Sequence, residues 1–488
     1  MKRKWINPSD HSDKIQKLKS DPRLTGISEE ALKILINRNI ETPSEIEMFL
    51  YGGLGDLWDT RLMKDAEKAV SIIVESLSKN EKIVVYGDYD CDGISGIATC
   101  MILMKNLGAN IDFYTNNRFE DGYGMSENGI DAILKKHNDV KLLISVDVGI
   151  VAHDAILYAK QKDIKVIVTD HHEQGDRLPL ADAVVDPKRI DCPYPNKDLC
   201  GAGVMFKLML LLYTKLGKDI KCVYETLDIV AMATVGDVVS LKTLENRIIV
   251  KEGIKLIKSE KRMAFKAFRE ITNVSDINSH FTLGFIYVPM INAIGRMDGN
   301  PEKAIKIFLE QDENLVYENL DYLKELNELR KKITTEQCEF AENILLQKLN
   351  NDAYVIYDKS FHEGIVGLIA GRLKEKYNKP VVVLTDSKEG EVKGSARSID
   401  PFHVKNAFDE LNYLLLGYGG HAKAAGLSLK KTNLELFEKG FIDLCTKQLN
   451  SNDFVKKYNI DLFIKPEDIN IDLIDDLQRL EPFGEGFN

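Results

Sequence analysis

Acidic and imidazole side chains gather in three short runs, each directly after an apolar, β-branched stretch. The run VVYGDYDCDG (84–93) carries three alternating aspartates, Asp147 follows ISV, and His171 and His172 follow VIVTD. Three carboxylates this close together repel one another and stay ionised together only when a cation compensates them. These residue types and this spacing predict metal-ion chemistry.

The acidic run has two simpler interpretations. The pattern D-x-D-x-D-G also opens a calcium-binding EF-hand loop, but that loop places Glu at its twelfth position, which is Thr99 here, and it follows a helix rather than a strand. A solvated acidic turn without a role is the other. Taken singly, an Asp after a strand is commonly a helix cap, and a lone His is more often a satisfied core residue.

A fourth candidate is Asp237, in the apolar run IVAMATVGDVVSL. A carboxylate inside such a stretch is costly unless it is paired or bound to a metal. The alternative is a helix cap at Gly236–Asp237.

Strand-like and helix-like stretches alternate from residue 82 onward. The expected strands cover 82–88, 110–116, 141–147 and 165–172, with helices near 95–107, 126–137 and 151–162. Such alternation predicts right-handed βαβ units and a parallel sheet. Because ligands bind beyond the carboxyl ends of such strands, we expect the acidic run, Asp147 and the histidines to converge there.

The mixture of ligands indicates which metals fit. Carboxylates combined with imidazole suit Mn²⁺, Zn²⁺ or Fe²⁺ better than Mg²⁺, which prefers oxygen and water. Four or five carboxylates and a histidine are enough for two ions that share one bridging aspartate. Two ions about 3.5–4 Å apart suit displacement at phosphorus.

The fold class predicted for the whole chain is α/β, with a long helix between two unequal domains. Residues 302–363 contain neither Gly nor Pro, and their leucines recur at near-helical spacing, which predicts a connecting helix over 312–349. A second α/β pattern follows, with strands expected at 352–358, 380–386, 391–398 and 424–430. The expected division is a helical N-terminal region (1–80), a catalytic domain (81–311), the helix (312–350), a smaller α/β domain (351–450) and a C-terminal extension (451–488).

The composition limits the classes of protein to which the chain can belong. The chain has 488 residues, of which 44% are hydrophobic and 29% charged, which is typical of a globular protein with two or three domains. Seven scattered cysteines without a Cys-x-x-Cys pair indicate free thiols in a reducing cytosol. The apolar run 204–213 is too short to span a bilayer, and no secretory signal follows the basic N-terminus, so we expect a cytoplasmic protein without a membrane segment. The net charge of −11 argues weakly against a nucleic-acid coat, but not against a nucleic-acid enzyme.

The motifs taken together resemble a known superfamily. GDYDCDG, SVDVG, TDHHE and VGDVV, in this order, resemble the four motifs of the DHH phosphoesterases, and GSARS (394–398) and GGHAKAAGLSL (419–429) resemble the accompanying DHHA1 domain. Within the superfamily the sequence is most similar to the RecJ-type single-strand-specific exonucleases. That similarity extends over nearly the whole chain and includes the runs 37–50, 117–126, 289–299 and 361–373.

The resemblance assigns roles to individual residues. It implies metal ligation by Asp90, Asp92, Asp147, His171 and Asp237, with Asp88 beside them either as a further ligand or as an acid that contacts the ligands. His172 would orient the catalytic site or contact the scissile phosphate. It implies substrate contacts by Arg118, Asn292, Arg296, His362, Ser395, Arg397, Gly420 and His421. Arg296 would grip a backbone phosphate, and the Ser395, Arg397, Gly420 and His421 group would hold a terminal phosphate or the nucleotide end, because arginine pairs with phosphate in a bidentate manner.

The sequence departs from the family pattern at two places. Tyr86 stands where many DHH enzymes have a His, a departure that RecJ-type members often share. The chain stops at LEPFGEGFN, where RecJ-type enzymes lead into an oligonucleotide-binding barrel, so we expect that barrel to be missing and affinity for single strands to be lower than in complete members.

The resemblance implies a 5′→3′ exonuclease for single-stranded DNA that releases nucleoside 5′-monophosphates in DNA repair and recombination. It would use two divalent ions, with Mn²⁺ expected and Mg²⁺ as the alternative. A single-strand-binding protein or a helicase is a candidate partner. Two rival functions are a DHH phosphodiesterase for short oligonucleotides or cyclic dinucleotides, and a non-catalytic replication scaffold.

Overall fold

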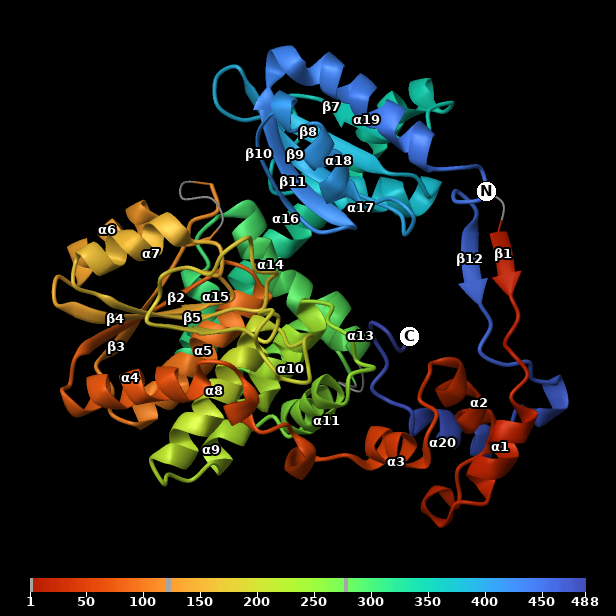
Figure 1. Cartoon of the computed structure of the whole chain (residues 1–488), viewed down its shortest axis with the longest axis horizontal. Helices are drawn as coiled ribbons and strands as arrows, with labels where there is room; N and C mark the ends of the chain where they lie inside the picture. The colour runs from red at the N-terminus through yellow and green to blue at the C-terminus, as the bar shows by residue number, and fades with distance from the viewer. Residues whose placement is uncertain (1–2, 120–123, 276–279) are drawn as a thin grey trace. The chain divides into compact units, whose positions relative to one another are not determined.

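The computed structural model describes residues 3–119, 124–275 and 280–488, which form two compact units (Figure 1). The larger unit comprises Asp10–Asn327 and Ile464–Asn488, and the smaller one Met1–Ser9 and Glu328–Phe463. The division falls inside α16 (Glu313–Leu345), close to the helix predicted over 312–349. Unlike the predicted division, each unit includes a segment from the opposite end of the chain.

The larger unit contains the predicted parallel sheet. Its strands are β2 (Lys82–Gly87), β3 (Ile111–Thr115), β4 (Val140–Val146), β5 (Lys165–Thr169) and β6 (Ala183–Val185), in the order β3-β2-β4-β5-β6 and parallel throughout. The sequence analysis missed β6, which is only three residues long. Neighbouring strands β2 and β4 leave the sheet toward different sides, through helices α5 (Cys91–Asn106) and α7 (His153–Gln161), so the sheet has a topological switch point between them.

Alternating side chains of these strands build one apolar core on each face of the sheet. Ile83, Val85 and Ile144 pack with α5 and with α8 (Gly201–Lys215) on one face, whereas Val84 and Tyr86 pack with α7 and α6 (Glu127–Lys136) on the other. A Cβ on Gly96 of α5 would lie 2.2 Å from the side chain of Val146, so this helix approaches β4 closely only because the residue is glycine. The close packing fixes the start of α5, which carries the acidic run.

Most of the further helices of this unit add side chains to the apolar core around α5 and α8. They are α4 (Ala66–Ser78), α9 (Lys221–Tyr224), α10 (Leu227–Gly236), α11 (Leu244–Lys258), α12 (Met263–Thr272), α13 (His280–Thr282), the π-helical turn η4 (Leu283–Tyr287), α14 (Val288–Met297) and α15 (Glu302–Leu309). None of the helices in the described ranges is both long and apolar enough to cross a membrane.

The N-terminal region is helical as predicted, but it is completed by the other end of the chain. Helices α1 (Ser12–Lys19), α2 (Glu29–Asn37) and α3 (Pro43–Tyr51) share an apolar cluster with Leu480 and Phe487, which follow α20 (Ile471–Gln478). In the smaller unit, β1 (Arg3–Ile6) pairs in parallel with β12 (Lys456–Asn459). Neither pairing was predicted, because each joins segments more than 400 residues apart in the sequence.

Arg247 of α11 binds the C-terminal segment of the larger unit through hydrogen bonds. Its side chain is 1% exposed, stacks 3.6 Å above the ring of Phe49, and donates hydrogen bonds to the carbonyls of Phe49, Leu480, Glu481 and Pro482 at 2.5–2.9 Å. Burial lowers the pKa of this guanidinium to about 9. The contacts satisfy buried carbonyls that would otherwise lack donors.

We expect Arg247→Met to destabilise the larger unit by roughly 2–4 kcal/mol, because it leaves buried carbonyls without donors. The matched control is Lys251→Met, since Lys251 lies one turn further along α11 and, within the described residues, donates to one carbonyl, that of Leu50, at 2.9 Å. Urea unfolding followed by circular dichroism measures both changes. Equal losses in the two variants would show that the four-carbonyl contact has no special role.

The smaller unit has a mixed sheet in the order β10-β11-β9-β8-β7. Its strands are β7 (Tyr354–Tyr357), β8 (Val381–Asp386), β9 (Glu391–Arg397), β10 (Leu415–Gly420) and β11 (Ala424–Lys430), and β7 and β8 form its parallel pair. Helix α17 (Val366–Tyr377) connects β7 with β8, while α18 (Val404–Glu410) and α19 (Leu434–Gln448) pack on the sheet through Phe408, Phe437 and Phe441. The α/β pattern is confirmed, but β10 was not predicted, because its sequence LLGYGG is rich in glycine.

Candidate metal centre

The carboxyl ends of β2, β4 and β5 meet at the edge predicted from the sequence. Gly87, Val146 and Thr169 are aligned by the strand register, so Asp88, Asp147 and Asp170 follow at the same level of the sheet. The predicted strand 165–172 ends at Thr169, which leaves both histidines beyond the sheet. The cluster therefore lies at the switch point between β2 and β4, where α/β proteins bind ligands.

All seven residues predicted for the centre come together in the larger unit. His171 Nε2 lies 3.0 Å from Asp147 Oδ1 and 3.7 Å from Asp92 Oδ2, while His171 Nδ1 lies 3.6 Å from Asp237 Oδ2. Within the described residues, three groups have ligand atoms within 4.8 Å of one another: Asp88–Asp90–Asp147, Asp92–His171–Asp237 and Asp147–His171–His172. Asp147 and His171 each belong to two groups, an arrangement suited to neighbouring cations that share ligands.

Several atoms of the cluster are buried without a hydrogen bond. They are Oδ1 of Asp88, Oδ1 of Asp147 and both ring nitrogens of His171, judged within the part of the chain that the structure describes. The 3.0 Å approach of His171 to Asp147 has the length but not the angle of a hydrogen bond. Buried polar atoms are normally satisfied, and carboxylate oxygens with imidazole nitrogens are a donor set for Mn²⁺, Zn²⁺ or Fe²⁺. The residues present fit bound divalent ions.

The acidic run does not form a calcium loop, because α5 begins at Cys91, within the run itself. Asp90 caps this helix: its Oδ1 accepts hydrogen bonds from the backbone N–H groups of Asp92 and Gly93, at 2.9 and 3.2 Å. The capping alternative is therefore correct for one oxygen of Asp90, and its carboxylate also belongs to a candidate ligand group. Asp237 is likewise the residue at the C-terminal end of α10.

The N-terminus of α8 holds Asp92, a contact that sequence reasoning missed. The carboxylate of Asp92 accepts hydrogen bonds from the backbone N–H groups of Gly201 (2.6 Å) and Ala202 (2.8 Å). The positive end of a helix dipole stabilises a carboxylate placed there. A Cβ on Gly201 would lie 2.6 Å from that of Asp147, so glycine is needed at this position. The run CGAGV (200–204) is the only local signal in the sequence.

Burial and mutual repulsion disfavour the charged form of most carboxylates in the metal-free cluster. Burial, followed by repulsion from neighbouring aspartates, raises the pKa values of Asp88, Asp147 and Asp237 well above the usual value of an aspartate. The same two causes raise the pKa of Asp92 to about 6. Burial and the charge of His172 lower the pKa of His171 to about 3, so His171 is neutral at pH 7. Cations would restore the ionised, metal-binding form of the carboxylates.

Asp170 orients His172 rather than joining the ligand groups. Its Oδ1 accepts hydrogen bonds from the ring Nδ1 of His172 (2.8 Å) and from the backbone N–H groups of both histidines, and its Oδ2 accepts one from Ile150 N–H (2.8 Å). Burial opposes protonation of His172, but this hydrogen bond and the nearby carboxylates raise its pKa to about 9. His172 therefore carries a positive charge at neutral pH.

Asp170→Asn is expected to reduce turnover about 10–100-fold, since it removes the carboxylate that fixes the position and charge of His172. The increase in melting temperature on adding Mn²⁺ should persist, because Asp170 belongs to none of the three ligand groups. Turnover and Mn²⁺-dependent melting curves of the same preparation test this. Loss of the Mn²⁺ response would instead place Asp170 among the ligands.

Asp186 is a second residue that sequence reasoning missed. It follows β6, is fully buried, and has one oxygen, Oδ2, without a hydrogen bond within the described residues. Burial and the charge of Asp170 raise its pKa to about 8. Its strand was too short to be recognised, so the acidic residue at its end was overlooked.

The predicted substrate residues of the larger unit lie around the acidic run. Asn292 Oδ1 accepts a hydrogen bond from the Cys91 N–H at 2.7 Å, so this side chain positions the start of α5. The Arg118 guanidinium lies 5.3 Å from the ring centre of Tyr89, and burial raises the pKa of Tyr89 to about 12 against the opposing charges of Arg118 and Arg296. Residues 120–123 of the run 117–126 lie outside the described residues. A phosphate contact by these three side chains stays a prediction.

The other predicted substrate residues belong to the smaller unit. Arg397 ends β9 and donates to Ser395 Oγ at 2.6 Å, and burial lowers the pKa of its guanidinium. Gly420 ends β10 and His421 follows it, at the same end of the sheet as Arg397, since Ala424, which pairs with Arg397, accepts from the His421 N–H. His362 precedes α17 and its Nδ1 accepts from the Gly364 N–H at 3.1 Å. Binding of a terminal phosphate by this group also stays a prediction.

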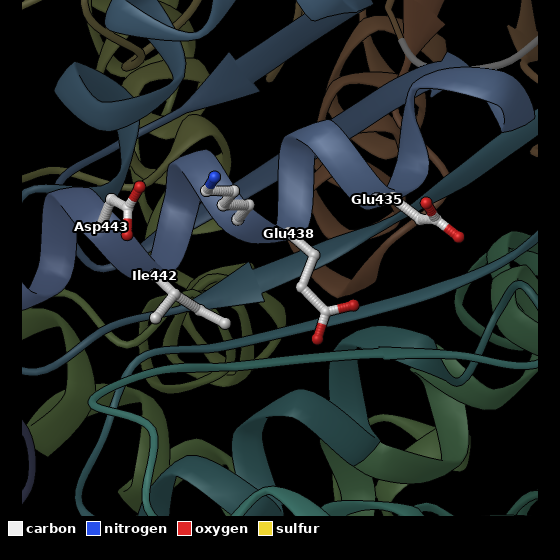
Figure 2. A pocket seen from close by; sticks show the side chains of 5 residues that line it. Glu435, Glu438, Ile442 and Asp443 are labelled. Carbon is white, nitrogen blue, oxygen red and sulfur yellow. The ribbon is translucent and has the colours of Figure 1, made fainter.

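The smaller unit has a surface hollow of about 340 Å³, but side chains from different elements do not converge on it as they do in the acidic cluster. Its lining comes from α19 alone, namely Glu435, Glu438, Lys439, Ile442 and Asp443. Figure 2 shows these side chains projecting in different directions from successive turns. Glu438 is already paired with Lys348. Nothing in this hollow competes with the acidic cluster as the candidate site.

A parallel sheet with a carboxylate–imidazole cluster at its strand ends, followed by a second α/β unit, agrees with the DHH and DHHA1 domains that the sequence motifs predict. The sequence model of the DHH family, N-terminal domain, matches residues 82–234, and that of the DHHA1 domain matches residues 341–447. The chain belongs to the family of RecJ single-stranded-DNA-specific exonucleases. It is 33% identical to RecJ of Escherichia coli (strain K12) over 93% of this chain and 81% of that protein.

Other relatives agree in fold and extend the comparison. The chain is 32% identical to RecJ of Bacillus subtilis (strain 168), covering 99% of this chain but only 60% of that protein. The crystal structure of Thermus thermophilus RecJ in complex with Mn²⁺ superposes with a TM-score of 0.86 at 25% identity, over 99% of this chain and 68% of that one. An exonuclease RecJ bound to manganese matches with a TM-score of 0.68 at 28% identity, over 80% and 98%.

Proposed function

We propose that this protein hydrolyses single-stranded DNA from its 5′ end, releasing nucleoside 5′-monophosphates with the help of two divalent metal ions. The observation that carries the proposal is the set of three overlapping ligand groups joined by Asp147 and His171. Shared ligands suit paired ions, and paired ions suit phosphodiester hydrolysis. The intact cluster counts against a non-catalytic scaffold.

Manganese is the proposed ion, with magnesium as the alternative. His171 belongs to two ligand groups and is neutral at pH 7, and a neutral imidazole suits Mn²⁺ better than Mg²⁺. Relatives bound to each ion support both choices: Thermus thermophilus RecJ is described in complex with Mn²⁺ and, separately, with Mg²⁺.

The chain's own residues supply binding, orientation and charge. Bound ions would act as Lewis acids that activate water and neutralise the phosphoryl oxygens. Asp92, whose carboxylate is held by the N-terminus of α8, and Asp147, which lies just past the end of β4, would serve as ligands. With Nδ1 bonded to Asp170, protonated His172 carries its second N–H on Nε2, which can donate to a phosphoryl oxygen as negative charge develops. Arg118 and Arg296 bring positive charge close to Tyr89, within the acidic run.

We infer the substrate, direction and setting of the reaction from membership of the family. The relatives are named for single-stranded DNA, which supports that substrate here. Action in DNA repair and recombination, a cytoplasmic location, and cooperation with a single-strand-binding protein or a helicase belong to the same proposal. The activity is proposed for a chain that spans 60% of the B. subtilis relative.

One assay tests the proposal directly. DNA oligonucleotides labelled at either end, as single strands and as duplexes, are incubated with Mn²⁺, Mg²⁺ or chelator, together with an RNA strand and a dinucleotide. We expect 5′-mononucleotides from single-stranded DNA with Mn²⁺, slower release with Mg²⁺ and none with chelator. Turnover of the dinucleotide alone would favour the short-oligonucleotide phosphodiesterase, and absence of all turnover with metal present would refute the proposal.

A further inference from the structure

Two phenylalanines of the larger unit expose most of their side chains although they stack on each other. Phe281 of α13 and Phe285 of η4 are 55% and 66% exposed, and their ring centres lie 4.8 Å apart with an interplanar angle of 26°. Burying a phenylalanine contributes about 1.5–3 kcal/mol, so leaving two adjacent rings in water is unfavourable unless another molecule covers them. A single exposed ring would need no explanation.

The local backbone brings this pair outward at the catalytic side of the larger unit. The η4 turn has π-helical geometry, which often marks functional positions. It packs on the end of α10: a Cβ on Gly284 would lie 3.2 Å from Val235, and one on Gly236 would lie 3.1 Å from Val288. Asp237, a candidate metal ligand, directly follows Gly236 at the C-terminal cap of α10. The two rings therefore belong to the element beside the metal centre.

The same helical segment continues to residues of the candidate site. Its inward positions, such as Leu283, Tyr287, Ile291 and Ile294, are buried in the core. The exposed Phe281 and Phe285 are followed, at spacings of seven and four residues, by half-buried Asn292, which binds the start of α5, and half-buried Arg296. Seven residues separate Phe285 from Asn292, about 10 Å along a helix. An aromatic pair thus precedes, on one side of one segment, the side chains next to the acidic run.

We propose that Phe281 and Phe285 form a stacking platform for nucleobases of the DNA strand outside the metal centre. This inference rests on the proposed function, since it concerns the path of the same substrate. Aromatic faces bind bases of any sequence, which suits an exonuclease that must accept every nucleotide. The continuity of the segment with the metal centre favours a nucleic-acid strand over a protein partner as the occupant.

Binding of base-bearing and abasic strands distinguishes stacking from other contacts. A fluorescent 20-nucleotide DNA strand and its fully abasic counterpart are titrated by anisotropy in Ca²⁺, with wild type, the double variant Phe281→Ala/Phe285→Ala, and Phe285→Trp. We expect the double variant to bind the base-bearing strand at least about tenfold more weakly, from a stacking contribution of ~1–3 kcal/mol per base, and the abasic strand as wild type does. Phe285→Trp should retain affinity, and its fluorescence should fall when the strand binds.

Kinetics and a matched control complete the test. Tyr51→Ala removes an exposed aromatic ring of similar exposure, 57%, from α3 and should leave binding unchanged. The double variant should raise KM for the long strand and change its kcat much less, because the pair lies beyond the metal centre. Unchanged affinity of the double variant for the base-bearing strand, or equal weakening with both strands, would overturn the inference. So would a wild-type protein that is a dimer, if the double variant becomes a monomer and its affinity for the strand does not change. Failure of wild type to bind or cleave any single strand would refute the proposed function instead.

Discussion

Replacing Asp147 by asparagine is expected to abolish metal-dependent hydrolysis, by a factor on the order of 10³ or more. Asp147 belongs to two of the three candidate ligand groups, lies 3.0 Å from His171, and is held at φ 61° just past the end of β4. Asparagine retains the size of the side chain and tolerates the left-handed backbone conformation, so the change removes a charged ligand and little else.

The same substitution should stabilise the metal-free protein. Burial and the neighbouring carboxylates raise the pKa of Asp147, which means that its charged form is unfavourable in the fold. In chelator at pH 8 the variant should therefore melt at a higher temperature than wild type, while the increase in melting temperature on adding Mn²⁺ should shrink. Asp139→Asn, an exposed change just before the opposite end of β4, is the control and should alter neither quantity.

Hydrolysis of labelled single-stranded DNA and thermal melting, with and without Mn²⁺, measure both effects. Retained turnover in Asp147→Asn would remove this residue from the mechanism. Lost turnover together with lower metal-free stability would show that Asp147 supports the fold rather than binding an ion.

Stability of the chelated protein is expected to fall as pH rises from about 6.5 to 9. Burial raises the pKa of Asp88, Asp147 and Asp237 and brings that of Asp186 to about 8. An acid with a raised pKa adds stability that is fully present below its unfolded-state pKa and lost as pH rises through its folded-state pKa. His172, with its pKa raised to about 9, loses its contribution between 6.5 and 9 in the same sense.

The lowered pKa of His171 has the opposite effect on stability, but only below pH 6.5. The pKa of His171 is lowered to about 3, so its contribution to stability grows between pH 3 and about 6.5 and is then complete. Above pH 6.5 every shift named here therefore reduces stability. Each proton held only by the folded state makes the slope steeper by about 1.4 kcal/mol per pH unit.

Bound Mn²⁺ should remove or reverse this slope, because metal ions compete with protons for the same ligands. Urea unfolding at pH 6.5, 7.3, 8.1 and 9, in chelator and in Mn²⁺, measures the two slopes. Asp186→Asn should flatten the chelator curve around pH 8 and leave the Mn²⁺ response in place, since Asp186 is in none of the ligand groups. Parallel curves in chelator and Mn²⁺ would show that the cluster does not bind the ion.

The alternation of strands and helices was enough to predict where the candidate metal centre lies. Asp88, Asp147 and the two histidines each follow an apolar strand, and strands of a parallel sheet end at one edge. That rule needs no knowledge of distant contacts, so the sequence alone brought these residues together. Asp237 was found for a different local reason, the cost of a carboxylate in an apolar stretch.

What surrounds the centre was decided only by the tertiary structure. The N–H groups of Gly201 and Ala202 that hold Asp92 are 109 and 110 residues away from it, and Asn292 is 201 residues from Cys91. Local periodicity contains no information on such pairs. The packing of Phe487 beside Phe49, and the binding of Leu480–Pro482 by Arg247, join still more distant segments. Sequence spacing therefore determined which groups form the candidate centre, whereas long-range packing decided which neighbours hold them and set their protonation.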